Sequence, residues 1–165
     1  MTPQDFLAEA ERRLTGAKYA VERATLQGVP AVIGRRKPFR IQWMLTQLKT
    51  SVVVCAVENV TAEGWLAFVA DATRIAREIK GGLPNGLQSG YGAVPVLAGT
   101  TVEPAAAGIA SQAQPKVEWF QGFAMPGLVD LTTRQEYGYN GKQLVGAIYV
   151  PFLRKQRSLI TSIVR

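Results

Sequence analysis

The sequence predicts one α+β domain, an antiparallel β-meander flanked by helices with a parallel crossover through a helix at 61–80. Three observations carry this prediction. The length of 165 residues is that of about one domain. A hydrophobic content of 47% with 19% charged residues is typical of a folded globular chain. Stretches with the helical period alternate with stretches of strand period along the chain. Since no repeat or linker interrupts this order, residues 1–165 are treated as a single globular domain.

The chain opens with signals for a helix over 3–14. Thr2 suits the N-cap, Pro3 suits the first helical position, and Asp5 in the first turn faces the positive end of the helix dipole. Gly16 ends the helix. One face of this helix carries the apolar residues Phe6, Leu7, Ala10 and Leu14.

Residues 17–58 change to a strand-like period and predict three or four antiparallel strands. Turns are expected near 27–29, 36–38 and 48–51. Alternating apolar residues predict a strand from Phe39 to Leu45. The continuous apolar run Val52–Val57 is typical of a strand that is buried on both faces.

Residues 61–80 show the clearest helical period, which ends at Gly81-Gly82. Five of the twelve residues from Gly81 to Gly92 are glycine, so a connecting loop is expected there. A phosphate loop runs from a strand into a helix, whereas this segment leaves a helix. A pocket in the loop is the remaining functional interpretation, and its candidate residues are Gln88, Ser89 and Tyr91.

The chain after Gly92 predicts a short strand at 94–98 and a helix from Glu103 to Gln112. Extended structure is expected over 117–132, followed by a hairpin turn at Asn140-Gly141. Pro151 suits the first turn of a final helix.

The composition excludes many kinds of catalytic site. Histidine is absent, which removes the Ser-His-Asp triad, the Cys-His pair and imidazole metal ligands. With one cysteine, neither an internal disulfide nor a cysteine-based metal site can form within the chain. We therefore expect no catalytic residue, no metal site and no cofactor, and the protein is not expected to be an enzyme.

The order helix, meander, helix, strand resembles the core of restriction-endonuclease-like folds. Such nucleases need acidic residues on adjacent strands with a lysine close by, so that a divalent metal can activate water. The one Glu-x-Lys of the chain, Glu78-Ile79-Lys80, falls at a helix end. The resemblance therefore favours a catalytically inactive protein with this type of fold. A carboxylate enzyme would need a pair such as Glu58 and Asp130 to converge.

Positive charge is the feature of the sequence that indicates a kind of binding partner. The formal net charge is +7, and four cations fall within six residues: Arg35, Arg36, Lys37 and Arg40. On a hairpin tip near 36–38 they would project into solvent and could contact phosphates. A solvated turn that prevents edge pairing is the simpler interpretation, and an acidic partner protein is a third. A second cationic group lies on the final helix at Arg154, Lys155 and Arg157.

The sequence therefore favours a non-catalytic cytoplasmic domain that binds a macromolecule, in a protein-interaction or assembly role. Nucleic-acid binding through the basic tip is the alternative, and a carboxylate enzyme of unstated reaction is the second alternative. A homo-oligomer is left open. No membrane partner is expected, because the apolar stretch Leu144–Leu153 is too short to cross a bilayer as a helix.

Overall fold

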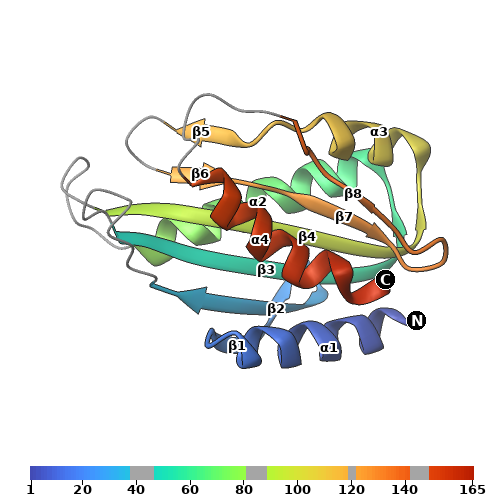
Figure 1. Cartoon of the computed structure of the whole chain (residues 1–165). Coiled ribbons are helices and arrows are strands. Elements are labelled where there is room, and N and C mark those ends of the chain that lie inside the picture. Colours follow the sequence, from blue (N-terminus) through green and yellow to red (C-terminus); the bar gives the residue numbers. More distant parts are fainter. Residues whose placement is uncertain (38–46, 81–88, 119–121, 142–148) are drawn as a thin grey trace.

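The computed structural model describes residues 1–37, 47–80, 89–118, 122–141 and 149–165, with the backbone alone at 47, 80, 89 and 116–118. Within these ranges the chain forms helices and strands in a mixed order (Figure 1). In chain order they are α1 (Pro3–Gly16), β1 (Ala20–Leu26), β2 (Val29–Arg36), β3 (Gln47–Val60), α2 (Ala62–Lys80), β4 (Ser89–Val102), α3 (Pro104–Gln112), β5 (Lys116–Glu118), β6 (Gly122–Ala124), β7 (Gly127–Asp130), β8 (Gln135–Tyr137) and α4 (Val150–Thr161), which continues into a 3-10 turn at Ser162–Val164.

The described strands form one open mixed sheet in the order β1-β2-β3-β4-β6-β5. Strand β7 continues the β6 edge along β4, and β8 pairs with β7. Pairs β1–β2 and β2–β3 are antiparallel, while β3–β4 is parallel and connected through α2. The α+β class, the antiparallel meander and the parallel crossover through helix 61–80 are therefore confirmed.

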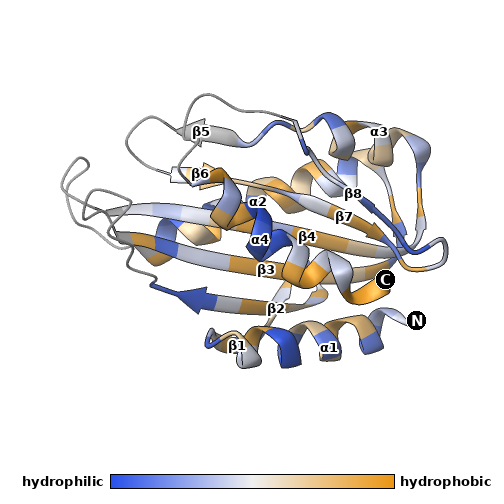
Figure 2. Ribbon diagram, viewed as in Figure 1, coloured by the Kyte–Doolittle hydropathy of each residue, from blue (hydrophilic) through white to orange (hydrophobic). Residues whose placement is uncertain are grey.

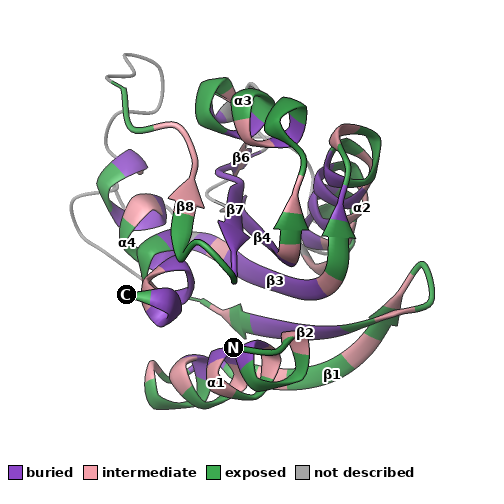
Figure 3. Ribbon diagram, turned by 90° about the vertical axis from the view of Figure 1, so that its right-hand side faces the viewer, coloured by how far each residue is buried: buried purple, intermediate pink, exposed green. Residues whose placement is uncertain are grey.

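The two helices at the start and end of the chain cover one face of the sheet, and the two middle helices cover the other (Figure 3). Helices α1 and α4 bury Phe6, Leu14 and Leu153 against this first face. On the opposite face, α2 and α3 bury Trp65, Phe68 and Ala106. Hydrophobic residues line β3 and β4 between the two layers (Figure 2). The sheet thus separates two apolar cores.

Helix α1 begins with the cap that the sequence predicts. The Thr2 hydroxyl accepts a hydrogen bond from the Asp5 backbone N–H at 3.2 Å, and the Asp5 carboxylate accepts one from the Thr2 backbone N–H at 3.2 Å. This reciprocal pair satisfies two amides that a helix start otherwise leaves unpaired.

The hairpin β1–β2 turns at Gln27-Gly28, as expected. Both residues have positive φ, +51° and +79°, which is the type I′ geometry that matches the twist of the flanking strands. Strand β2 extends to Arg36, so the predicted turn at 36–38 begins at Lys37 at the earliest. The predicted strand from Phe39 to Leu45 lies outside the described residues.

Strands β3 and β4 form the centre of the sheet and pair over thirteen positions. Val52 and Val54 face the α1–α4 core, while Val53 and Cys55 face the α2–α3 core. The predicted strand buried on both faces is confirmed. The turn predicted at 48–51 is wrong, because β3 already begins at Gln47 and buries Thr50 and Ser51. Polar residues there suggest a turn, yet they lie deep in the sheet.

Strand β4 also corrects the sequence interpretation of the glycine-rich segment. Residues 89–92 belong to the strand and not to a loop. At Gly92 a Cβ atom would come within 3.0 Å of Leu153 and 3.1 Å of Leu48. The glycine is therefore explained by close packing of leucines across the strand.

The final helix holds the segment before it in place. Arg157 is buried and donates to the Tyr139 carbonyl at 3.0 Å, and Arg154 donates to the Gly141 carbonyl at 3.0 Å. Residues 138–141, which precede and include the predicted Asn140-Gly141 turn, do not form a strand. Residues 142–148, which follow this turn, lie outside the described part of the chain. Two of the three cations grouped on the final helix thus bind backbone. In the described part of the chain, no helix has the length and hydropathy to cross a membrane.

Candidate nucleic-acid interface

The predicted basic cluster lies at the end of β2, where alternation divides it between the two faces of the sheet. Arg36 extends over the ring of buried Tyr19, with its guanidinium carbon 5.8 Å from the ring centroid. Arg35 and Lys37 point to the opposite face because neighbouring strand residues alternate. Arg35 forms an ion pair with Glu22 of β1. Arg40 lies outside the described residues.

The fold adds two further cations to Arg35 and Lys37. Arg36 is opposite Thr50 in the antiparallel β2–β3 register, which brings Lys37 alongside Lys49. Lys49 in turn is level with Tyr91 of β4, and the Arg77 guanidinium carbon is 6.0 Å from the Tyr91 ring centroid. We call Arg35, Lys37, Lys49 and Arg77 the basic end.

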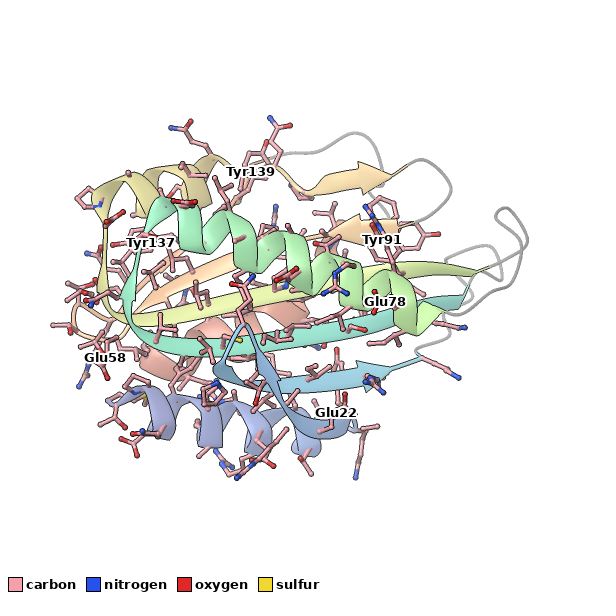
Figure 4. The ribbon with its side chains drawn as sticks, turned by 180° about the vertical axis from the view of Figure 1, so that it is seen from behind. Glu22, Glu58, Glu78, Tyr91, Tyr137 and Tyr139 are labelled. Atoms are coloured by element: carbon pink, nitrogen blue, oxygen red, sulfur yellow. The ribbon has the colours of Figure 1, made fainter. Side chains whose placement is uncertain are left out.

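The geometry of the crossover explains why these residues meet. A helix that connects two parallel strands runs antiparallel to them, so the C-terminal part of α2 returns to the starts of β3 and β4. Figure 4 shows Glu78 and Tyr91 at this end and Glu58 at the other. Neighbouring strands are about 4.8 Å apart. The backbones of Arg35 and Lys37 therefore lie within one to two strand spacings of the backbone of Lys49.

Sequence reasoning missed Lys49 and Arg77 as members of this surface. Lys49 falls in the turn predicted near 48–51, and Arg77 falls in the helix predicted at 61–80, with no sign in either local pattern that the two lie close together. The predicted parallel crossover contained the necessary signal, because it already implied that the end of helix 61–80 returns to the start of the buried strand.

Of the predicted pocket residues Gln88, Ser89 and Tyr91, the structure describes the side chain of Tyr91 alone. Gln88 lies outside the described residues, and Ser89 begins β4 with only its backbone described. Tyr91 is 1% exposed and packs beneath α2, where Arg77 Nε donates to its hydroxyl at 3.4 Å. The Tyr91 ring lies so close to Gly122 that a Cβ there would overlap it. Tyr91 is therefore a packing residue.

The carboxylates that an enzyme would need are not brought together. Glu58 is exposed near the end of β3. Asp130 ends β7, two strands away, and its Oδ1 accepts from the backbone N–H groups of Thr132 and Thr133 at 2.8 Å. Alternation along β3 and β7 directs these two side chains to opposite faces of the sheet. Their arrangement does not provide an acid–base pair.

The Glu-x-Lys motif of the resemblance also lies in the wrong place for metal chemistry. Glu78 is on the surface of α2, and its Oε1 accepts from Arg74 at 2.8 Å. Across the described ranges, no three His, Cys, Asp or Glu residues are grouped as metal ligands would be. Cys55 is buried, and this burial raises the pKa of its thiol to about 12. Such a thiol is a poor nucleophile.

A second surface has little charge and lies over α2 and α3. Leu66 on α2 is 51% exposed, and Ile109 on α3 is 37% exposed. The sequence of α3, Pro-Ala-Ala-Ala-Gly-Ile-Ala-Ser-Gln, contains no charged residue. This uncharged surface is on the same face of the sheet as the basic end and further along α2.

Comparison with known proteins identifies no relative of this chain. No protein-family model, no curated protein and no solved structure matches it.

Proposed function

We propose that this protein binds nucleic acid through the phosphate backbone at the basic end. The observation that supports this proposal is that cations from three elements lie on one surface. Arg35 and Lys37 are at the end of β2, Lys49 is in β3 and Arg77 is in α2. The net charge of +7 favours association with a polyanion over long range.

The described aromatic side chains near the basic end are not available to stack on bases. Tyr91 is buried beneath α2, and Tyr19 is buried with Arg36 over its ring. Contacts to phosphates position a protein on nucleic acid without reading its sequence. We therefore expect binding that depends strongly on salt and little on base sequence.

The test is fluorescence anisotropy of labelled duplex and single-stranded oligonucleotides at about 50 and 200 mM salt. Four phosphate contacts on a duplex imply a slope of about 3.6 in log affinity against log salt, or a loss of roughly 100-fold over this range. The triple variant Arg35→Gln, Lys37→Gln, Lys49→Gln keeps one of the four cations. Its affinity should fall only about 3-fold over the same range.

The matched control removes three cations elsewhere: Arg12→Gln, Arg23→Gln and Lys155→Gln. It lowers the net charge by the same amount but leaves the basic end intact, so its salt slope should remain close to that of the wild type. Equal slopes for the two triple variants would show that net charge, and not this surface, attracts the polyanion. Absence of binding at about 50 mM salt would overturn the proposal.

A protein-interaction role is the second candidate, and the surface over α2 and α3 favours it. Exposed Leu66 and Ile109 lie on helices that contact each other. Helix α3 has no charged residue, and the first turns of α2 around Leu66 have one, Glu63. Aliphatic residues at such a position are typical of the buried centre of an interface. Sedimentation velocity should show self-association that the pair Leu66→Lys and Ile109→Lys abolishes. A monomer at all concentrations, together with an unchanged binding profile of that pair toward co-purifying proteins, would exclude this role.

A further inference from the structure

A pocket opens on the α2 face of the sheet, at the end away from the basic end. It lies between the β1–β2 turn, the second half of β3 and the first half of α2, with one residue from β4. Its volume is about 140 Å³. The pocket is open to solvent on one side and is large enough to hold a small organic molecule.

The pocket exists because the hairpin leaves the sheet. Strand β2 pairs with β3 only from Ala31, which is opposite Cys55. Val29 and Pro30 pair with β1 alone, and proline has no N–H with which to continue a ladder. Beyond Cys55, β3 continues beside β4 while the β1–β2 turn diverges from it (Figure 3).

The interior of the pocket is apolar and its mouth is polar. Cys55 and Leu97 form the floor, and both are nearly inaccessible, with exposed fractions of 2% and 4%. Leu26, Val57 and Phe68 contribute to the walls.

Across the mouth, Gln27 Nε2 of the turn donates a hydrogen bond to Asp71 Oδ2 of α2. Asp71 also pairs with Arg74, with 3.6 Å between Oδ1 and Nη2. The other two polar side chains of the lining also have partners: Asn59 Oδ1 accepts from the Thr101 hydroxyl, and the Thr61 hydroxyl accepts from the Gly64 backbone N–H at 3.0 Å.

We propose that this pocket binds a compact, uncharged, apolar molecule about the size of one aromatic ring. An engineered apolar cavity of about 150 Å³ takes up benzene, and the volume of this pocket is close to that value. A water molecule needs two to four polar partners, which this floor does not supply. A charged ligand would lose its hydration against Cys55 and Leu97 without a countercharge on the floor.

The chain itself supplies no described segment to fill the pocket. The pocket lies at the end of β2 away from the basic end, beside Val29. Within the described ranges its space is therefore available to a molecule taken up from solution.

Cys55 gives a readout of the pocket because it is the one cysteine of the chain and lines the pocket. Its thiol is treated with two methanethiosulfonates of similar reactivity, the neutral methyl reagent and the negatively charged sulfonatoethyl reagent, and labelling is followed by mass spectrometry. The raised pKa of the thiol slows labelling by both reagents to the same extent, so the ratio of the two rates reports access to the pocket. Relative to a free thiol, the neutral reagent should label Cys55 at least tenfold faster than the charged one. Saturating toluene should slow the neutral reaction at least threefold.

A pair of variants separates the pocket from general effects on the protein. Val57→Phe adds a ring to a half-buried valine that lines the pocket and should abolish protection by toluene. Val21→Phe makes the same change at a half-buried valine of β1 that packs on the other core, and should keep the protection.

Two results would overturn the proposal. Equal labelling by both reagents with no effect of toluene would mean that Cys55 reacts through unfolding.

Amide chemical shifts of the wild-type protein provide a measurement that needs no variant. Toluene should shift the amides of Leu26, Cys55 and Phe68, and their constancy would show that the pocket stays empty.

Discussion

A buried hydrogen bond ties the first third of the chain to the final helix and allows a quantitative test. The Tyr19 hydroxyl donates to Gln156 Oε1 at 2.8 Å, and both side chains are at least 94% buried, with exposed fractions of 5% and 6%. Burial raises the pKa of Tyr19 above its ordinary value, so the hydroxyl stays protonated and able to donate. The perturbation is the set Tyr19→Phe, Gln156→Leu and the double variant.

The expected magnitudes follow from what each change leaves behind. Tyr19→Phe leaves a buried amide oxygen without a donor, and Gln156→Leu leaves a buried hydroxyl without an acceptor. Each should cost about 1–3 kcal/mol of the free energy of unfolding. The double variant removes both partners, so it should cost about as much as one single change. The expected coupling is therefore about 1 kcal/mol or more in favour of the pair.

Urea denaturation followed by tryptophan fluorescence measures these free energies. In thermal melts each single variant should lower Tm by roughly 2–4 °C per kcal/mol for a domain of this size. Tyr19→Phe keeps the ring beneath Arg36, so the cation–ring contact is a constant across that change. Costs that add in the double variant to within about 0.5 kcal/mol would refute the inference that this hydrogen bond joins the two segments.

Three further predictions concern other contacts. Gly122→Ala should destabilise the protein by about 1–3 kcal/mol in urea melts, because the new Cβ overlaps the Tyr91 ring; unchanged stability would contradict that packing. Asp130→Ala should cost about 1–2 kcal/mol because two backbone amides lose their acceptor, whereas Asp130→Asn keeps an acceptor oxygen and should cost less. Hydrogen bonds from two arginines lower the pKa of Glu9 from 4.5 to about 2. Its stabilising contribution is complete above pH 4.5 and is lost as pH falls toward 2, so melts of Glu9→Gln should differ from wild type at pH 7 and converge with it near pH 2.

The local signals in the sequence predicted most of the helices. Thr2 and Asp5 define a helix start through two hydrogen bonds that involve only neighbouring residues. The period of residues 61–80 likewise depends on one helix alone. The structure confirms both, with α2 ending at Lys80 before the predicted glycine pair.

Features that depend on distant residues were harder to predict. Thr50 and Ser51 look like turn residues until β2 and β4 pair on either side of them. Gly92 looks like part of a loop until Leu48 and Leu153 are known to pack beside it. The candidate interface has the same character. Arg35 and Lys37 were identified from their spacing, whereas Lys49 joins them only through the register of two strands.

The division of the sheet beyond Cys55 also determines which hydrogen bonds open first. Strands β3 and β4 are paired over thirteen positions beneath two helical layers, so their amides should exchange with solvent deuterium only when the whole domain unfolds. The amides at the β1–β2 turn, from Leu26 to Val29, depend on a two-stranded ribbon and should exchange through a smaller opening. That opening needs no disruption of the central strands. The turn end of the hairpin, before β2 joins β3 at Ala31, should therefore open separately from the rest of the sheet, and its opening sets how often the interior beneath it meets solvent.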